Sequence, residues 1–591
     1  MTGRSRAGYV PVAADPTSPE THQDVPHGGV LHVHPDGRSY TYAYGPPGVA
    51  GLLHNYYALG CAIFASIGGL TFGYDQGVIA NVLVMKDFVQ RWHLSAWETG
   101  LMSALTAGTL ADKYSRRQSI FTACAVFCLG SALQFGAQSP NHLILGRGIG
   151  GLGVGALSML SPLYMAEISP PEVRGSLMAL EQFAIVIGAV LGFWTGFFTR
   201  DIPGSACWRI PLGIQLIPGI LLGLGCMGLP PSPRLLVQQG RTEEALRSLA
   251  KLRLRSRGEI ESDPLLQIEL LEMQVEAALI EQTTTADSSA QNTKRGTFQA
   301  ELHAWQRLFT PKLRKRTFIG VTMMFFQQWS GINALLYYGP TLMRSLGLQG
   351  DAATLMSAGG VGIVQFLAVL PAIVFIDRLG RRPLLRGGSL VMALSHLLIA
   401  SLVWTYSSDW PSHALAARVA LLCVYTFTAA YGMSYGPIGW ILPSEVFPLS
   451  ARSKGVALST ASNWMNNFLI GLLTPVFMER SASATFLIFA IACSLGYIWS
   501  TCAVPETANV SLEEIDAVFG SSAGREDLAL KHQVGRSPFS ALQMTLRSPG
   551  PVPLVYRSKP TSVCMILYSG GPSRLLIPRS IPVLTVGVFS R

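Results

Sequence analysis

The sequence predicts an all-α membrane protein whose twelve transmembrane helices form two six-helix bundles. Of 591 residues, 49% are hydrophobic and 13% are charged, and the mean hydropathy is +0.35. A soluble protein carries about 25% charged residues, so this composition indicates many membrane spans. Apolar stretches separated by polar loops recur twelve times, and the charged motifs of the first six return in order in the second six. Such a repeat is typical of transporters built from two related halves.

Charge and cysteine content argue against several other classes of protein. The net charge is +10, from 44 Lys and Arg against 34 Asp and Glu. Multi-span proteins concentrate Lys and Arg in their cytoplasmic loops, so this excess does not indicate nucleic-acid binding. The nine Cys residues are scattered without metal-ligand spacing, so we interpret them as small core residues. We expect no metal, no cofactor and no enzymatic activity. Residues 1–50 lack the apolar core of a signal peptide, and the first span is expected to direct membrane insertion.

The chain divides into five predicted segments. We expect a disordered cytoplasmic tail, a first bundle, a cytoplasmic loop with amphipathic helices, a second bundle, and a largely disordered cytoplasmic tail; these cover residues 1–51, 52–229, 230–316, 317–504 and 505–591. The predicted spans are 56–80, 101–111, 120–138, 143–165, 177–198, 211–229, 317–339, 358–376, 388–404, 418–442, 455–477 and 485–503.

The second predicted span is too short for an ordinary transmembrane helix. Only residues 101–111 are apolar before Asp112. Eleven residues extend about 17 Å as a helix. The hydrocarbon core of a bilayer is about 30 Å thick. A truncated product that does not transport is therefore one of the alternatives that the sequence leaves open.

The distribution of positive charge predicts the orientation. Loops after even-numbered spans hold most Lys and Arg residues, including 14 between Arg234 and Arg316. Loops after odd-numbered spans hold few. Both termini are therefore predicted to be cytoplasmic.

The seventh span carries three amides in an apolar surrounding. Gln327, Gln328 and Asn333 offer hydrogen-bond donors and acceptors without charge. Polar groups in a membrane normally face the bundle interior or a water-filled cavity. They fit a neutral ligand rich in hydroxyl groups. The alternative is that they hydrogen-bond neighbouring helices and only hold the bundle together.

Two opposite charges are predicted inside the first bundle. Asp75 lies in the first span and Arg147 in the fourth. Because an ionisable group within a membrane requires a partner, we expect these two side chains to pair. The alternative for Asp75 is an acid at a helix end that reaches interfacial water. The glycines around Arg147 match a dinucleotide-binding pattern, but they lie in a membrane span and follow no strand, so we reject that function.

The two halves of the chain repeat each other at their loops. Asp-Lys-Tyr-Ser-Arg-Arg at 112–117 matches Asp-Arg-Leu-Gly-Arg-Arg at 377–382. A Glu and an Arg seven residues apart follow the fourth span and again the tenth: Glu167 with Arg174, and Glu445 with Arg452. Six-plus-six repeats predict a binding site between the two bundles near the middle of the membrane.

Residues 53–519 resemble the sugar porters of the major facilitator superfamily, and most of all the fungal hexose transporters. The motifs that carry the resemblance are Gly-Gly-Leu-Thr-Phe-Gly-Tyr-Asp (68–75), Gly-Thr-Leu-Ala-Asp-Lys-Tyr-Ser-Arg-Arg (108–117), Pro-Leu-Tyr-Met-Ala-Glu-Ile-Ser-Pro (162–170), Pro-Pro-Ser-Pro-Arg (230–234), Gln-Gln-Trp-Ser-Gly-Ile-Asn-Ala-Leu-Leu-Tyr-Tyr (327–338), Asp-Arg-Leu-Gly-Arg-Arg (377–382), and Pro-Glu-Thr with Leu-Glu-Glu-Ile-Asp (505–516). The chain departs from the family's pattern at the short second span, at Pro231, which stands where the family carries a Glu, and at Gln365, which stands where many members carry Asn.

The resemblance implies roles for particular residues. The substrate-binding residues it implies are Gln182, Gln327, Gln328, Asn333, Gln365, Trp440 and Asn467. It implies that Tyr337 and Tyr338 gate the outer side, and that Asp75 and Arg147 couple transport to protons. A cytoplasmic charge latch would comprise Asp112, Arg116, Arg117, Glu167, Arg174, Asp377, Arg381, Arg382, Glu445 and Arg452.

The function implied by the resemblance is sugar transport by alternating access, with proton symport and a monosaccharide substrate. The expected partners are a small neutral sugar, a proton and the lipid bilayer, with no nucleic acid. The expected state is a monomer in the plasma membrane. Facilitated uniport and a sugar sensor that signals through its C-terminal tail are the alternatives. The resemblance does not identify the substrate, because carriers of hexoses, pentoses, disaccharides, polyols and cyclic acids such as quinate share these motifs.

Overall fold

A computed structural model gives the arrangement of the chain. It describes residues 21–24, 29–33, 40–46, 49–82, 85, 115–256, 258, 260, 263–289, 302, 305–311, 313–347, 351–447, 451–507, 557–559 and 562–564. Residues 101–111 of the predicted second span, and the latch residue Asp112, lie outside these ranges. The side chain of Asp377, within helix α17, is also outside what the structure describes.

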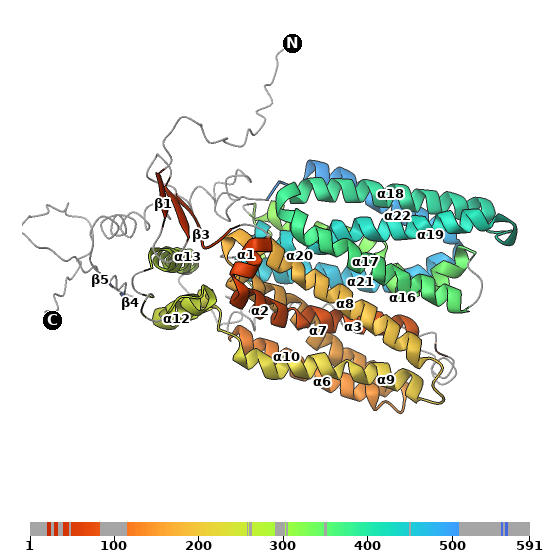
Figure 1. Cartoon of the computed structure of the whole chain (residues 1–591), viewed down its shortest axis with the longest axis horizontal. Coiled ribbons are helices and arrows are strands. Elements are labelled where there is room, and N and C mark those ends of the chain that lie inside the picture. Colours follow the sequence, from red (N-terminus) through yellow and green to blue (C-terminus); the bar gives the residue numbers. More distant parts are fainter. Residues whose placement is uncertain are drawn as a thin grey trace, which may run out of the picture.

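Long helices lie roughly side by side in two groups (Figure 1). The first half comprises α1 (Val49–His54), α2 (Tyr56–Ala65), α3 (Ile67–Val82), α6 (Arg116–Phe135), α7 (Pro140–Ile168), η1 (Pro171–Val173), α8 (Arg174–Thr199), α9 (Ala206–Ile214), α10 (Leu216–Gly225) and η2 (Cys226–Gly228). The second half comprises α15 (Arg314–Trp329), α16 (Ile332–Ser345), α17 (Asp351–Leu379), α18 (Arg381–Tyr406), η3 (Pro411–His413), α19 (Ala414–Met433), α20 (Tyr435–Val446), α21 (Arg452–Arg480) and α22 (Ala482–Cys502).

Nine helices within the described residues are long and apolar enough to cross a membrane. The seventh predicted span falls below that limit because it is divided into α15 of 16 residues and α16 of 14 residues. The eleventh falls below it because α21 carries a row of Ser, Thr and Asn side chains. Apart from five short strands, the regular secondary structure of the described residues is helical, which agrees with the all-α membrane class predicted from the sequence.

Two predicted spans are broken instead of continuous, which corrects the sequence-based boundaries. The seventh ends as α15 at Trp329 and resumes as α16 at Ile332, because Gly331 has a left-handed backbone with φ of +95°. The tenth breaks between α19 and α20 at Ser434, where φ is −127° and ψ is −87°. Broken helices place unpaired backbone groups at the centre of many transporters.

The loop helices and the N-terminal segment gather at one end of the bundles (Figure 1). The loop contains α11 (Pro233–Gln238), α12 (Thr242–Leu252) and α13 (Pro264–Ser289). Beside α13 lies an antiparallel sheet of β1 (Thr21–Asp24), β2 (Val30–Val33) and β3 (Tyr40–Ala43). Two further strands, β4 (Arg557–Lys559) and β5 (Ser562–Cys564), pair in the C-terminal tail. We call this end of the molecule the loop-helix end.

The N-terminal tail is ordered where the structure describes it, which corrects the expectation of disorder for that part. The Tyr44 side chain is 3% exposed and packs with apolar residues of α12 and α13. Its hydroxyl donates to Glu269 Oε2 at 2.7 Å, and its backbone N–H donates to Glu172 Oε1 at 3.2 Å. A single aromatic anchor thus joins the tail to the loop helices and to η1, just before α8.

Candidate functional site

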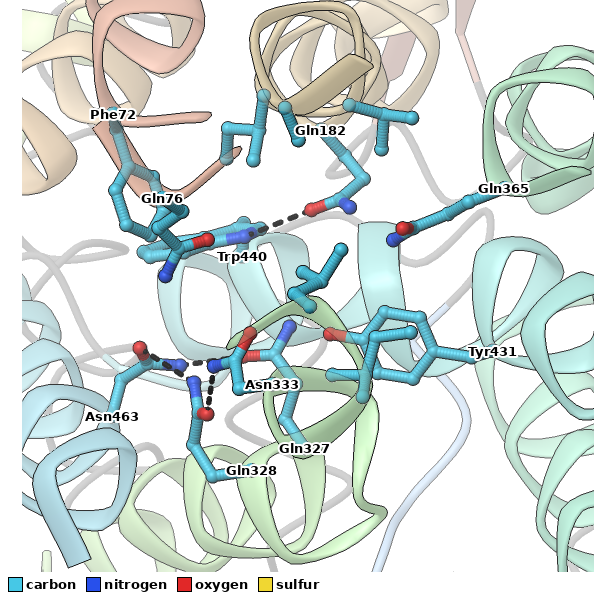
Figure 2. A pocket seen from close by; sticks show the side chains of 15 residues that line it. Phe72, Gln76, Gln182, Gln327, Gln328, Asn333, Gln365, Tyr431, Trp440 and Asn463 are labelled. Carbon is cyan, nitrogen blue, oxygen red and sulfur yellow. Dashed lines mark hydrogen bonds between the residues drawn. The ribbon is translucent and has the colours of Figure 1, made fainter. Parts of the chain in front are cut away.

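A cavity lies between the two halves, with residues of both in its wall (Figure 2). About 410 Å³ within it is free of protein atoms, a volume that includes open solvent. Its lining joins uncharged amides to apolar and aromatic side chains: Phe72, Gln76, Gln182, Ile185, Val186, Ala189, Gln327, Gln328, Ile332, Asn333, Leu336, Gln365, Tyr431, Trp440 and Asn463. No charged side chain is in this lining, so the cavity suits a neutral polar ligand.

A network of amides forms one wall of the cavity. Gln327 Nε2 donates to the carbonyl of Tyr435 at 3.0 Å, and its Oε1 accepts from Asn463 Nδ2 at 2.6 Å. Gln328 Nε2 donates to Asn463 Oδ1 at 2.9 Å, and Asn333 Nδ2 donates to Gln328 Oε1. Because each amide fixes the next, the network has a set geometry. Gln327 Nε2 also donates to the Gly436 carbonyl at 3.2 Å, and Asn463 Nδ2 also donates to Met324 Sδ at 3.3 Å.

The opposite wall places an indole beside an amide of the other half. Trp440 Nε1 of α20 donates to Gln182 Oε1 of α8 at 3.1 Å (Figure 2). The Phe72 ring of α3 meets Trp440 edge-on, with ring centroids 6.2 Å apart. Gln365 of α17 directs its amide into the cavity from a third side (Figure 2). A flat aromatic surface with amides at its rim is suited to a ligand that has both an apolar face and hydroxyl groups.

The helix break beside the amide network is held by a buried histidine. His396 of α18 is 1% exposed, and its Nε2 lies 2.9 Å from the Ser330 carbonyl oxygen. Since a carbonyl only accepts, Nε2 carries the proton. The Ser330 hydroxyl donates back to the Gln327 carbonyl at 2.7 Å. These bonds satisfy backbone groups that the break would otherwise leave unpaired, and so hold α16 in place.

The predicted gate tyrosines lie on α16, beyond the break. Tyr337 donates its hydroxyl proton to Asn467 Oδ1 at 2.8 Å and accepts from Gln76 Nε2 of the first half at 3.2 Å. Tyr338 donates to the Gly471 carbonyl at 2.6 Å. Tyr337 therefore connects the halves, whereas Tyr338 fixes α16 to α21.

Asn467 lies outside the cavity lining in this structure. Its Oδ1 is occupied by Tyr337, and its Nδ2 is buried without a hydrogen-bond partner among the described residues. A direct contact between Asn467 and a substrate stays a prediction.

The two charges predicted inside the first bundle meet. Arg147 Nη1 lies 2.6 Å from Asp75 Oδ1, and the carboxylate side chain is 16% exposed. Asp75 adjoins Gln76, so the ion pair is one residue from the hydrogen bond that reaches Tyr337 across the halves.

The charge clusters at the loop-helix end pair within each half. Arg116 binds Glu167 with its Nη2 at 2.8 Å from Oε1, and Arg381 binds Glu445 with the same atoms at 2.8 Å. Both arginines are buried, and both glutamate side chains are 11% exposed. Arg174 and Arg452 are the first residues of α8 and α21, at the equivalent places of the two halves.

The neighbouring arginines also behave alike in the two halves. Arg117 donates to the carbonyls of Met227 and Leu229, each at 3.2 Å, at the end of the first bundle. Arg382 donates to the Thr501 carbonyl at the end of the second. The structure therefore repeats the duplication seen in the sequence down to individual hydrogen bonds.

The second half contains a helix cap that has no counterpart in the first half. Glu506 accepts from the backbone N–H groups of Arg381 and Arg382, at 2.9 and 3.1 Å, and so caps the start of α18. Pro231 occupies the matching place in the first half and has no acceptor in its side chain. Its own carbonyl instead accepts from the Ser248 hydroxyl of α12 at 2.6 Å.

The cavity also contains residues that sequence reasoning missed. The cavity wall contains four residues that were not predicted: Asn463, Gln76, Phe72 and Tyr431. Asn463 lies one helical turn before Asn467 and Gln76 directly follows Asp75, so helical spacing could have indicated both. Tyr431 precedes the break at Ser434, which the sequence did not indicate.

Comparison with known proteins places the chain in a family. The family model described as "Sugar (and other) transporter" matches residues 61–519, more than three quarters of the chain. The chain belongs to this family. It is a transporter and not an enzyme, and it spans the membrane several times.

Several relatives are sugar carriers. A probable glucose transporter of Neurospora crassa, rco-3, is 31% identical over 78% of this chain and 79% of its own length. The glucose transporter GlcP of Staphylococcus epidermidis is 32% identical over 77% and 95%. A quinate permease of Neurospora africana is 30% identical over 79% and 89%.

Solved structures confirm the major facilitator fold. The proton:xylose symporter XylE, bound to 6-bromo-6-deoxy-D-glucose, is 26% identical with a TM-score of 0.63, covering 78% of this chain and 99% of that one. An inward-open form of XylE from E. coli gives a TM-score of 0.56 at the same identity and coverage. The transporter thus has the two-bundle architecture predicted from its sequence.

Proposed function

We propose that the transporter carries a monosaccharide through the plasma membrane by alternating access, in symport with a proton. The observation that supports this most is the uncharged amide network of Gln327, Gln328, Asn333 and Asn463, which faces Gln182 and Trp440 of the opposite wall. An amide can both donate a hydrogen bond to a hydroxyl group and accept one from it. An indole ring can cover the apolar face of a pyranose. Relatives named as glucose transporters agree with this substrate class.

The rocking of two halves about this site would be controlled at both ends. Toward Tyr337, the Gln76 hydrogen bond joins the halves. Toward the loop-helix end, Ser176 of α8 donates to the Ile373 carbonyl of α17 at 3.2 Å, and Trp464 Nε1 donates to Ser158 Oγ at 3.1 Å. Each is an ordinary hydrogen bond, worth about 0.5–1.5 kcal/mol net, so either set can break in turn. We propose that the loop-helix end and both termini are cytoplasmic, from the Lys and Arg bias.

Proton coupling is proposed at Asp75 and Arg147. Protonation of Asp75 would leave Arg147 without its counter-charge, and removing one partner of a partly buried pair changes the relative stability of two conformations. The neighbouring Gln76–Tyr337 bond gives this change a direct route to the contact between the halves.

Uptake of radiolabelled glucose and xylose into transporter-null cells tests this function. Wild type should accumulate sugar above the outside concentration, and a protonophore should abolish the accumulation. Asp75→Asn should abolish uphill accumulation but keep exchange of internal for external sugar. Uphill uptake by Asp75→Asn would refute the coupling, and equilibration without accumulation in wild type would indicate uniport. Absence of uptake for every sugar in a panel with pentoses, polyols and quinate would refute transport itself.

A further inference from the structure

Glu181 is a carboxyl group buried inside the first bundle, and it has no partner in the part of the chain that the structure describes. It is 1% exposed and lies in α8, one residue before Gln182. Neither of its oxygens has a hydrogen-bond partner among the described residues. It is absent from the cavity lining, so its place is behind the wall that Gln182 and Trp440 form.

The carboxyl group faces the helix that carries Asp75. A Cβ placed on Gly69 of α3 would lie 2.8 Å from Glu181 Oε1, so the two helices touch at the carboxyl itself. The same contact continues along the helices, where Gly73 meets the Ile185 carbonyl and Gly77 meets the Ala189 carbonyl. Any change at Glu181 therefore acts on the packing of α3, which carries Asp75.

A second buried polar group lies beside the same turn of α3. The Ser161 hydroxyl of α7 is fully buried, has no hydrogen-bond partner among the described residues, and lies against Gly68. Unsatisfied buried polar groups are rare in native structures and require an explanation. Glu181 of α8 and Ser161 of α7 thus lie against consecutive glycines of α3.

Several charged groups on the helices packed against α8 pair with other residues, and Arg378 in the last turn of α17 is exposed. Asp75 pairs with Arg147, Glu167 with Arg116, and Glu445 with Arg381. Other ionisable side chains on these elements also bind other groups: Tyr74 the Pro211 carbonyl, Tyr164 the Pro230 carbonyl, Tyr435 the Ser389 hydroxyl, Arg209 the Ala137 carbonyl, Glu172 the Tyr44 N–H, and Tyr57 the Lys251 ammonium. No described cation therefore pairs with Glu181.

We propose that Glu181 is a second proton-binding site of the carrier, on the loop-helix side of the sugar cavity. An ionised carboxylate without cation or hydrogen bond in a bundle interior costs several kcal/mol, so the group is neutral in this conformation. In its ionised form, the Glu181 carboxylate takes up one proton from water. It releases that proton to water when a later conformation of the carrier exposes the group. With Asp75 toward the opposite end, one acid then lies on each side of the substrate.

The position along the helix supports this placement. Arg174, the first residue of α8, lies at the loop-helix end, and Glu181 follows it by seven residues, or about 11 Å of helix. Asp75 lies far along α3, near the Tyr337 gate. The proposal rests on the proposed transport function, but not on Asp75 being the coupling residue.

Sugar exchange at equal pH on both sides of proteoliposomes tests the proposal. Wild-type exchange should fall as the pH rises, because each pH unit above the group's pKa lowers the protonated fraction about tenfold. Glu181→Gln mimics the neutral acid. This variant should still exchange sugar, but its exchange rate should no longer fall as the pH rises. Asp75→Asn should keep the alkaline loss, and Glu243→Gln, an exposed acid of α12, should match wild type.

The outcomes separate the two proposals. Identical pH profiles in wild type and Glu181→Gln overturn the role of Glu181 while leaving transport intact. No exchange in any variant overturns the transport function. If Glu181→Gln alone is inactive, the wild-type protein is treated with a hydrophobic carbodiimide, which reacts with protonated carboxyl groups. An adduct located at Glu181 by mass spectrometry, decreasing at alkaline pH, supports the proposal, and its absence at acidic pH overturns it.

Discussion

Asn463 shows how a single side chain organises the sugar wall. Its Nδ2 donates to Gln327 at 2.6 Å, and its Oδ1 accepts from Gln328 at 2.9 Å. The sequence marked both glutamines, because paired amides in an apolar stretch are conspicuous. It did not mark Asn463, which lies among other small polar residues of α21. The direction of a side chain within such a row depends on helix rotation, which composition does not contain.

Substitution of Asn463 should weaken sugar binding. Asn463→Ala leaves one acceptor and one donor of the glutamines unmatched, at a cost of about 1–3 kcal/mol. We expect the Kd or KM for sugar to rise about 5- to 150-fold. Competition binding to purified protein measures this. The control is Asn466→Ala, which removes a bond to Trp329 outside the cavity lining. Equal affinities in the two variants would contradict the assigned wall.

At the scale of elements, the break between α15 and α16 sets the geometry of the site. Gly331 adopts φ of +95°, and a Cβ there would lie 2.9 Å from the Phe489 ring. The sequence predicted one continuous span here because apolar residues continue on both sides. The glycine was visible, but its backbone conformation depends on His396 and Phe489, which lie far along the chain.

Gly331→Ala should destabilise the break. A non-glycine residue in the left-handed region costs about 1–2 kcal/mol, and the contact with Phe489 adds to it. We expect a lower thermal unfolding midpoint in detergent and reduced uptake. Gly60→Ala, on α2 with no heavy atom within 4 Å of the new Cβ, should behave as wild type. Normal stability and uptake in Gly331→Ala would show that the break is not required.

At the scale of the molecule, a buried cluster joins the N-terminal tail, the loop helices and the first bundle. Arg253 Nη2 lies 2.6 Å from Glu269 Oε1, and its Nη1 donates to the Ile168 carbonyl at the end of α7 at 3.0 Å. Tyr44 binds the same Glu269 and lies under Arg253, 5.2 Å from ring centroid to guanidinium. The two bundles, the loop and the charged repeats could be predicted, since they follow from periodicity. This cluster could not, because nothing local relates residues 225 apart.

Loss of Glu269 should destabilise the loop-helix end. Glu269→Ala leaves Arg253 buried without its counter-charge, which costs about 3–5 kcal/mol. The unfolding midpoint in detergent should fall. The double variant Arg253→Met/Glu269→Leu should recover most of the loss, because it removes both charges. A double variant as unstable as Glu269→Ala would contradict the account.

The cluster should also give a defined pH dependence. Burial alone would raise the pKa of Glu269, but Arg253 and Tyr44 outweigh it and the pKa lies below the ordinary value. The stabilisation is fully present above the pKa that Glu has in the unfolded chain, about 4.3. It is lost as the pH falls through the lower pKa of Glu269 in the folded protein. Burial raises the pKa of Glu172, so its effect is opposite and stability falls as the pH rises through that pKa. Unfolding midpoints across acidic pH should show a loss for wild type that Arg253→Met/Glu269→Leu lacks, whereas an equal loss in both would exclude this cluster as its cause.

The central claim is that the two halves alternate around a sugar held by the amide wall, and counterflow tests it most directly. Proteoliposomes are loaded with unlabelled glucose, and labelled glucose is added outside at equal pH. An alternating carrier predicts a transient accumulation of label above equilibrium, which Asn463→Ala reduces at low outside concentration and Asn466→Ala preserves. Entry of label without an overshoot, or no entry at all, would contradict the account.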